Sequence, residues 1–198
     1  SHDLRTPLTR MRLQLALMTN NEDTKAISSD ISEMEEMIDG YLAFAAGEGD
    51  EPPQELAVDK LLNRLVTQAQ KSHKFDITLS PVKDEIPAFP MRRNAIQRAF
   101  SNIISNAIRY STKTIVAIRI RNDEVIITFD DNGAGIPRER RADAIRPFIR
   151  LEESRNRRTG GAGLGLSITS DVILSHGGEL TLGDSPLGGL RVAVKLPV

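Results

Sequence analysis

The sequence contains no cysteine and no tryptophan, and aromatic residues make up only 4% of its 198 residues. The lack of cysteine excludes disulfides and thiolate metal sites, and it fits a reducing compartment. No apolar run approaches the roughly 20 residues that a membrane-spanning helix needs, and no signal peptide opens the chain. The formal net charge is −1, so no overall charge favours a nucleic-acid partner.

The overall composition is typical of a globular protein. Hydrophobic residues reach 39% and charged residues 27%, which indicates one or two folded domains and excludes a disordered or fibrous chain. The chain starts at Ser1 without an initiator Met. We therefore expect a piece of a longer protein, whose membrane segments, if it has them, would lie elsewhere.

Residues 1–46 are predicted to form a helical hairpin. Two apolar stripes with helical spacing are separated by a polar turn near residues 19–23. The stripes are Leu4, Leu8, Met11, Leu15 and Met18, followed by Ile27, Ile31, Met34, Ile38 and Leu42. One hairpin buries both stripes poorly, so we expect a homodimer that completes a four-helix bundle. The alternative is a hairpin that packs on the rest of its own chain.

A linker rich in glycine, proline and acidic residues is predicted over residues 47–54, before a second domain at 55–198. The second domain is predicted to be α+β, with helices on one face of a mixed sheet. Asn122 and Asp123 are expected to form a hairpin turn. The expected helices are 56–69, 95–110 and 164–175, and the expected strands are 75–79, 114–121, 124–130, 179–183 and 190–196.

Two glycine motifs point to a ligand. The first, Asp131-Asn132-Gly133-Ala134-Gly135-Ile136-Pro137, follows a predicted strand and offers a carboxylate that can accept from an exocyclic amine such as that of adenine. Its alternative is an ordinary turn. The second, residues 160–166, precedes a helix, whose exposed amides attract phosphate. It fits neither a Walker loop nor a dinucleotide fingerprint, and its alternative is a flexible loop at a helix entry.

The helix predicted over residues 95–110 carries polar side chains on an otherwise apolar face. Asn102 and Asn106 are four residues apart, so they share that face. Their amide oxygens suit Mg²⁺, or else they bind the neighbouring loop. Arg109 could meet a phosphate and Tyr110 could pack on a base, or both could be surface residues.

Arginines crowd the segment between the two glycine motifs. A lid that closes over a polyphosphate explains these cations and the glycines together. A nucleic-acid patch is the weaker alternative, because aromatic residues hardly interleave the cations. The arginines are Arg138, Arg140, Arg141, Arg146, Arg150, Arg155, Arg157 and Arg158.

In order and spacing, these motifs resemble the nucleotide-binding domain shared by histidine kinases, gyrase, Hsp90 and MutL. Within that group, residues 1–10 (Ser-His-Asp-Leu-Arg-Thr-Pro-Leu-Thr-Arg) resemble the phosphoacceptor box of sensor histidine kinases, closest to the EnvZ-like type. Residues 146–150 resemble their phenylalanine box. The resemblance implies a dimeric phosphotransfer hairpin followed by an ATP-binding sandwich, and it covers nearly the whole chain.

The resemblance also implies roles for single residues. His2 is the expected phosphoacceptor, Asp3 its base or orienter, and Thr6 a residue that places water for dephosphorylating a partner. Asn106 is expected to hold Mg²⁺, with Asn102 supporting it, and Asp131 to read the adenine amine. The expected nucleotide contacts are Asn102, Asn106, Arg109, Tyr110, Asp131, Gly133, Gly135, Ile136, Phe148, Arg150, Gly161, Gly163, Leu164, Gly165 and Leu166.

The function implied is ATP- and Mg²⁺-dependent autophosphorylation of His2, then phosphoryl transfer to an aspartate of a response regulator. The homodimer is expected to be the cytoplasmic part of a parent anchored in the bacterial inner membrane, with no nucleic-acid partner. Two alternatives stay open. A hydrolysing ATPase of the Hsp90 or MutL type would release phosphate without a phosphohistidine, and a silent docking scaffold would not bind ATP.

Overall fold

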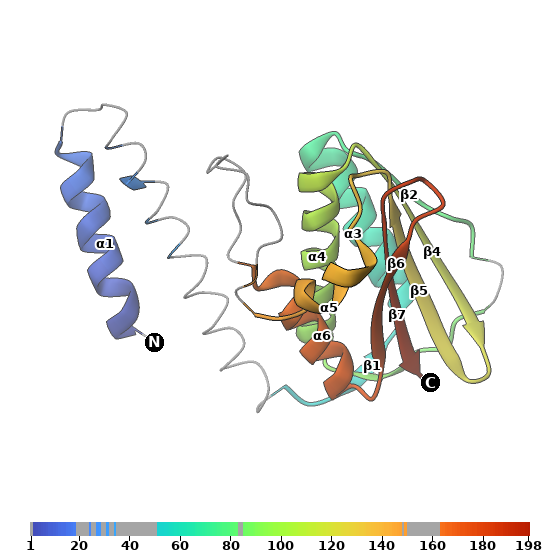
Figure 1. Ribbon diagram of the computed structural model, residues 1–198. Coiled ribbons are helices and arrows are strands. Elements are labelled where there is room, and N and C mark those ends of the chain that lie inside the picture. Colours follow the sequence, from blue (N-terminus) through green and yellow to red (C-terminus); the bar gives the residue numbers. More distant parts are fainter. Residues whose placement is uncertain are drawn as a thin grey trace.

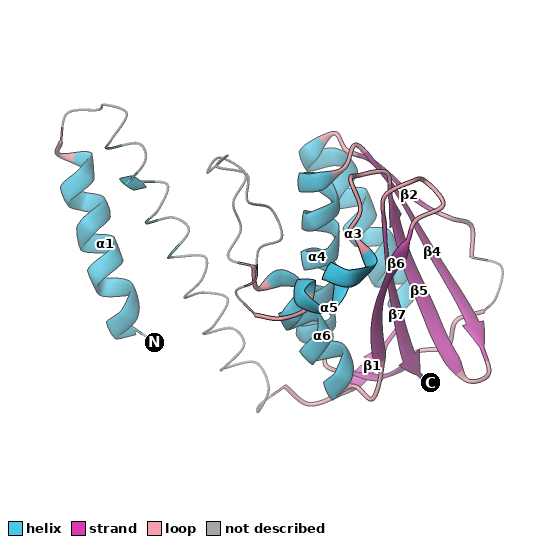
Figure 2. Cartoon of the chain, viewed as in Figure 1, coloured by secondary structure: helices cyan, strands magenta, loops and turns pink. Residues whose placement is uncertain are grey.

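The computed structural model describes residues 2–18, 24, 27, 28, 31, 34, 51–82, 85–147, 149 and 163–198. Its second part is a two-layer sandwich in which helices cover one face of a five-stranded sheet (Figures 1 and 2). The helices are α1 (His2–Ala16), α3 (Val58–His73), α4 (Arg93–Tyr110), α5 (Arg141–Ala144) and α6 (Gly165–Ser175), with a 3-10 turn η1 (Arg138–Arg140). The strands are β1 (Gln54–Leu56), β2 (Asp76–Leu79), β3 (Phe89–Met91), β4 (Lys113–Arg121), β5 (Glu124–Asp131), β6 (Glu179–Asp184) and β7 (Leu190–Pro197). The predicted α+β class is confirmed.

The large sheet has the strand order β2-β4-β5-β7-β6. Strands β4 and β5 form the predicted hairpin, and its turn residues Asn122 and Asp123 have φ angles of 52° and 58°. Two positive φ angles in a two-residue loop suit the right-handed twist of the strands. β7 pairs antiparallel with β5 and β6, whereas β2 runs parallel to β4. The register places Thr114 opposite Asp131.

The core lies between this sheet and helices α3, α4 and α6. Alternate residues of each strand face the helices, among them Val116, Ile127 and Val194, each fully buried. Phe100 of α4 packs on Phe129 of β5 with ring centroids 5.9 Å apart. This packing fixes α4 against β5. Polar residues on the next turns of α4 therefore lie close to the end of that strand.

Two short elements differ from the sequence prediction. Strands β1 and β3, three residues each, pair with one another outside the main sheet. Leu56, predicted to begin a helix, belongs to β1, and the helix begins at Val58. Three residues are too few for a two-residue alternation to stand out in a sequence, so the local pattern could not predict these strands.

Glu51, which the sequence places in the linker, is fastened to the sandwich. Its carboxylate accepts hydrogen bonds from the backbone N–H groups of Asn94 at 2.8 Å and Ala95 at 3.3 Å, in the first turn of α4. The residue at the N-cap position, Arg92, makes no side-chain cap of its own. Glu51 therefore caps α4 from outside the helix.

The hairpin region is described only in part. α1 is helical as predicted, and so are the described residues of the second stripe, Ile27, Ile31 and Met34; Ile38 and Leu42 lie outside the described residues. Leu8 and Ile31 are 3% and 4% exposed, but other stripe residues keep 45% exposure or more: Met11, Met18, Ile27 and Met34. The chain by itself therefore leaves part of the predicted seam open to solvent. In the described part of the chain, no helix is long and apolar enough to span a bilayer.

Candidate functional site

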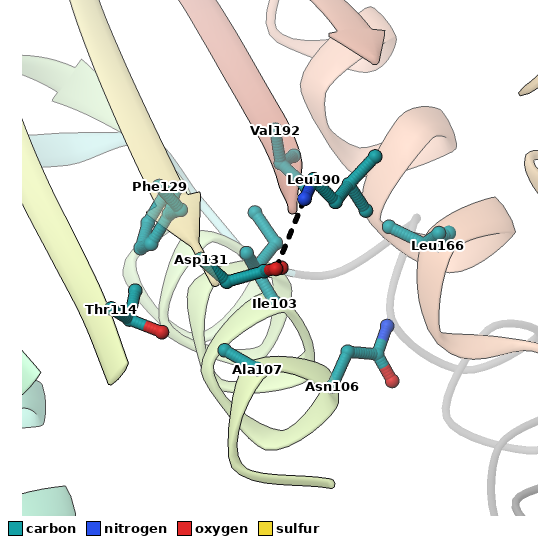
Figure 3. Close-up of a pocket in the computed structure, with 9 residues that line it drawn as sticks. All are labelled: Ile103, Asn106, Ala107, Thr114, Phe129, Asp131, Leu166, Leu190 and Val192. Atoms are coloured by element: carbon teal, nitrogen blue, oxygen red, sulfur yellow. Dashed lines mark hydrogen bonds between the residues drawn. The ribbon is translucent and has the colours of Figure 1, made fainter. Parts of the chain in front are cut away.

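Asp131 ends β5 and is buried, with 9% of its surface exposed. One carboxylate oxygen, Oδ1, accepts hydrogen bonds from the backbone N–H groups of Gly133 at 2.8 Å and Leu190 at 3.0 Å. Figure 3 shows the second of these bonds crossing from β5 to the start of β7. Among the described residues no hydrogen bond reaches Oδ2. The carboxylate is therefore fixed in orientation and keeps one oxygen for a ligand.

A cavity of about 20 Å³ lies beside this carboxylate, between α4, the sheet and the start of α6. Its walls are mostly apolar, and its polar side chains are Asp131, Thr114 and Asn106 (Figure 3). The complete lining is Ile103, Asn106, Ala107, Thr114, Phe129, Asp131, Leu166, Leu190 and Val192. Apolar walls with a few fixed polar groups are typical of small-molecule sites.

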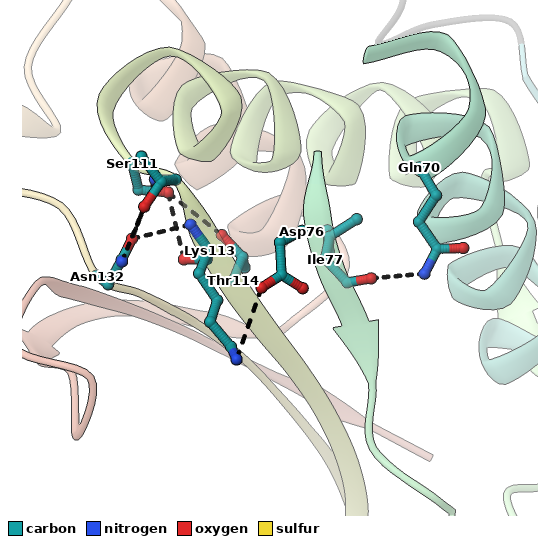
Figure 4. Close-up of polar contacts among 8 residues, drawn as sticks. Gln70, Asp76, Ile77, Ser111, Lys113, Thr114 and Asn132 are labelled. Carbon is teal, nitrogen blue, oxygen red and sulfur yellow. Dashed lines mark hydrogen bonds and ion pairs between the residues drawn. The ribbon is translucent and has the colours of Figure 1, made fainter. Parts of the chain in front are cut away.

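The turn after Asp131 is held by Asn132. Its Oδ1 accepts from the backbone N–H groups of Thr112 at 3.0 Å and Lys113 at 2.9 Å, where α4 passes into β4 (Figure 4). Lys113 also forms an ion pair with Asp76 of β2 at 3.6 Å. The Asp-Asn-Gly sequence is a turn, as the alternative interpretation has it, and the same turn fixes the carboxylate in the cavity.

Close packing explains the glycines of the first motif. A Cβ atom on Gly133 would run into the carbonyl oxygen of Tyr110, and it would also lie 3.1 Å from Oδ1 of Asp131. Gly135 has a φ of 69°, in the left-handed region that glycine adopts without strain. The carbonyl of Ile136 accepts a hydrogen bond from Nε of Arg141 at 3.0 Å. Arg141 also pairs with Asp184, so this arginine of the predicted lid binds the end of β6.

The two asparagines of α4 have different surroundings. Nδ2 of Asn102 donates to the carbonyl of Gly165 at 3.4 Å, and the same carbonyl accepts from Oγ1 of Thr169 at 2.7 Å. Asn102 therefore ties α4 to the first turn of α6, which is the neighbouring-loop role that the sequence left open. Asn106 is half-buried, and no hydrogen bond to its amide is found in the described residues. Its oxygen is available to a ligand.

The first turn of α6 lies next to Asn106 of α4. Gly163 has a φ of 67°, and the first hydrogen bond of the helix runs from Ile168 N–H to Leu164 O at 2.9 Å. The N–H groups before Ile168 belong to the first turn, where they have no partner within the helix. Gly165 passes within van der Waals distance of Asn106, since a Cβ there would stand 3.7 Å from Nδ2. Among the described residues no acceptor is found for these N–H groups, and they border the same space as the Asn106 amide.

The other predicted site residues either do not line the cavity or lie outside what the structure describes. Arg109 and Tyr110 are exposed at the end of α4, and neither lines the cavity. His2, Asp3 and Thr6 are in α1, but their side chains lie outside what the structure describes. Phe148, Arg150 and Gly161 fall outside the described residues altogether. The contacts predicted for all these residues stay predictions.

The fit of Mg²⁺ depends on Asn106. In the described residues, no group of three or more His, Cys, Asp or Glu side chains could hold a metal ion. A magnesium ion would thus have to take most of its ligands from nucleotide phosphates and water, which is its usual preference. The half-buried, unbonded amide of Asn106 beside the amides of α6 fits that coordination.

His176 directly follows the last residue of α6 and has a structural role. Nε2 accepts from the backbone N–H of Arg92 at 3.1 Å, and Nδ1 lies 2.7 Å from the carbonyl of Val172, to which it donates. Burial lowers the pKa of His176 below its ordinary value of 6.5. The neutral ring uses both nitrogens, so this histidine holds the end of the helix in place.

Sequence reasoning missed the contribution of β7 and the loop before it. Leu190 donates to Asp131, and a Cβ atom on Gly189 would lie 2.6 Å from the Asp131 carbonyl oxygen. Thr114, fully buried in the cavity wall, was also not singled out. The only local signal was the pair Gly188-Gly189, which is equally typical of an ordinary turn between strands.

Comparison with known proteins matches both parts of the chain. Residues 91–198 match the family described as Histidine kinase-, DNA gyrase B-, and HSP90-like ATPase, and residues 1–50 match the His Kinase A (phospho-acceptor) domain. Sensor histidine kinase CpxA of Escherichia coli is 33% identical over 210 residues, which cover 100% of this chain and 45% of CpxA. The chain thus spans about half the length of the curated relatives it matches.

Solved structures agree with the fold. The ATP binding domain of PrrB from Mycobacterium tuberculosis is 27% identical, with a TM-score of 0.59 over 75% of this chain and 98% of that domain. Full-length ShkA, solved in complex with AMPPNP, has a TM-score of 0.72 over 99% of this chain and 44% of its own, at 19% identity. The chain belongs to the sensor histidine kinases, and it comprises a phosphoacceptor domain followed by the ATPase-type domain of that family.

Proposed function

We propose that this chain binds ATP and transfers its γ-phosphoryl group to His2. The observation that carries the proposal is the Asp131 carboxylate, which two backbone N–H groups hold through Oδ1. Oδ2 is then the acceptor for the exocyclic amine of adenine. The apolar walls of the cavity suit the two faces of the base, and the register partner Thr114 adds a hydroxyl group beside the carboxylate.

The phosphates belong next to the first turn of α6. Free N–H groups at a helix N-terminus, together with the helix dipole, favour an anion. Asn106 would hold Mg²⁺, which neutralises charge on the phosphates when it is bound. Asn102 keeps the two helices together through the Gly165 carbonyl. Arg109, Tyr110, Ile136 and Leu166 are proposed to surround the nucleotide, together with Phe148, Arg150 and Gly161 of the lid segment.

The proposed reaction needs one nucleophile. A neutral imidazole nitrogen of His2 attacks the γ-phosphorus, the bond from that phosphorus to the β–γ bridging oxygen breaks, and ADP leaves. Asp3 accepts the proton or the hydrogen bond of the other ring nitrogen. The phosphoryl group then passes to an aspartate of a response regulator, and Thr6 would place a water that hydrolyses the aspartyl phosphate and releases inorganic phosphate.

The active assembly is proposed to be a homodimer. Apolar residues of both hairpin stripes stay exposed on the single chain, among them Met11, Ile27 and Met34, and a second hairpin would cover them in a four-helix bundle. The relatives extend well beyond the matched region. We infer that the parent protein carries its sensor there, together with a membrane anchor that keeps this region in the cytoplasm.

The experiment uses ATP labelled on the γ-phosphate. Acid-labile, base-stable label on the protein, absent in His2→Gln, is the expected result. ATP labelled on the α-phosphate is the control, and it should leave the protein unlabelled. Steady phosphate release without protein label would instead indicate a hydrolysing ATPase, and no nucleotide binding at all would indicate a docking scaffold.

A further inference from the structure

Gly189, the last residue before β7, lies against the base-recognition carboxylate. Its N–H donates to the carbonyl of Asp131 at 3.2 Å, and its own carbonyl accepts from the N–H of Ser185 at 3.0 Å. The next residue, Leu190, donates its N–H to Oδ1 of Asp131. The backbone N–H groups of residues 189 and 190 thus hydrogen-bond both the main chain and the side chain of Asp131.

The space at Gly189 admits no side chain. A Cβ atom would stand 2.6 Å from the Asp131 carbonyl oxygen, and it would come closer still to Oδ1 of Asp131 and to the amide nitrogen of Gly133. Gly189 does not have a positive φ angle, whereas its neighbour Gly188 has a φ of 94°. Close approach to the carboxylate, rather than backbone conformation, therefore requires glycine at this position.

The surrounding strands cannot easily yield to a methyl group. On the neighbouring rung, Arg191 of β7 donates two hydrogen bonds to Asp130 of β5, at 2.6 and 2.9 Å, and Asp130 is 6% exposed. Such a bidentate pair has fixed geometry, and the two residues are also register partners. Because β5 and β7 are held together beside the contact, the turn at residues 131–133, which carries the carboxylate, is the part that has to shift.

We propose that Gly189 is a positioning residue for base recognition, which keeps the Asp131 carboxylate aimed at the exocyclic amine of the purine. The proposal rests on the proposed ATP site. It separates recognition of the base from binding of the phosphates, because Gly189 touches the Asp131 turn and none of the residues assigned to the phosphates. A methyl group here should therefore weaken selection of the base and leave the phosphate contribution in place.

The test compares magnesium complexes of ATP and inosine triphosphate, whose base has a carbonyl oxygen where adenine has its amine. In Gly189→Ala, calorimetry should show ATP binding weakened by about tenfold or more, the effect of losing one hydrogen bond to a charged group. Binding of inosine triphosphate should change much less, so the preference for ATP falls. A general loss of structure would weaken both nucleotides equally.

Gly183→Ala is the matched control. This glycine lies in β6, and a Cβ there would have as its nearest neighbour the Cβ of Arg191 at 3.9 Å, an ordinary contact. Both dissociation constants should equal those of the wild type. Thermal unfolding of each variant records whether the fold is intact.

A double variant tests whether Gly189 acts through the Asp131 carboxylate. Asp131→Ala removes the contact with Oδ1, whereas the contacts of a Cβ with the Asp131 carbonyl oxygen and the Gly133 nitrogen remain. Adding Gly189→Ala to Asp131→Ala should therefore cost stability but little further ATP affinity. The proposal is overturned if the two substitutions lower ATP affinity additively, or if Gly189→Ala alone unfolds the domain, because the glycine is then needed for the fold rather than for the carboxylate. If wild type binds ATP and Gly189→Ala retains its ATP preference, only this inference fails; if wild type binds no ATP, the proposed function fails first.

Discussion

Substitution of Asp131 by asparagine should reverse the base preference without unfolding the domain. The Asn carbonyl oxygen can replace Oδ1 and accept from the N–H groups of Gly133 and Leu190. These two donors then fix the amide with its NH₂ group where Oδ2 stood. The site would present a donor to the adenine amine, which is also a donor.

The magnitude follows from the bond that is lost. A hydrogen bond to a charged group contributes about 1.5–3 kcal/mol, so the dissociation constant for ATP should rise by about 10- to 150-fold. Inosine triphosphate, with an acceptor at that position, should bind the Asp131→Asn variant better than the wild type. The two backbone hydrogen bonds lose their charge assistance, so we expect unfolding to become easier by about 1–2 kcal/mol.

The assay is calorimetric titration of both nucleotides into wild type and Asp131→Asn, with thermal unfolding as the control for the fold. Asp76→Asn serves as the matched variant, because Asp76 is an exposed carboxylate at the start of β2 that pairs with Lys113. Its nucleotide affinities should match those of the wild type. An Asp131→Asn variant that binds ATP normally and still rejects inosine triphosphate would refute the assignment of Asp131 as the base reader.

Three further predictions concern the metal, the helix cap and the partly buried His176. Asn106→Ala should abolish the gain in ATP affinity that Mg²⁺ gives, measured by titration with Mg²⁺ and with a chelator, because it removes the proposed protein ligand. Glu51→Ala should lower the free energy of unfolding by about 1–2 kcal/mol, since α4 loses an external cap with a charge at its N-terminus; denaturant unfolding measures this. Stability should also fall as the pH drops below 6.5, because burial lowers the pKa of His176 and the unfolded state then binds the proton more readily.

Each of these predictions has a control. Ser105→Ala, on an exposed position of α4 one residue before Asn106, should leave the Mg²⁺ effect unchanged. Glu55→Ala, exposed on β1, should be close to neutral for stability, and equal losses at Glu51 and Glu55 would contradict the cap. His176→Gln keeps an acceptor for the Arg92 N–H but does not titrate, so its stability should vary less with pH; an unchanged pH slope would rule out His176 as the source.

Local pattern predicted most of the regular structure, because long elements repeat their signal. The helix expected over 95–110 is found at Arg93–Tyr110, and the hairpin turn at Asn122 and Asp123 is found with the expected positive φ angles. Both features depend on a few neighbouring residues. The family resemblance implied that Asp131 and Asn106 share one site, and both line the same cavity.

Long-range contacts could not be predicted in the same way. Gly189 and Leu190 lie almost sixty positions beyond Asp131, and only the β5–β7 pairing brings them together. Arg141 looked like one more cation of the lid, but it pairs with Asp184 on β6. The type of a residue determines what it can bind, whereas the partner that it meets depends on the topology of the sheet.

The central claim is that this chain moves the γ-phosphoryl group of ATP to His2, and locating the phosphoryl group tests it most directly. After incubation with Mg²⁺ and ATP, the protein is digested at neutral to alkaline pH, where phosphohistidine survives, and its peptides are mapped by mass spectrometry. The account predicts the phosphoryl group on the imidazole of His2, and at early times about a fifth as much or less on the Asp131→Asn variant at an ATP concentration that half-saturates the wild type. A phosphoryl group on another residue, or ATP turnover that leaves every peptide unmodified, would contradict it.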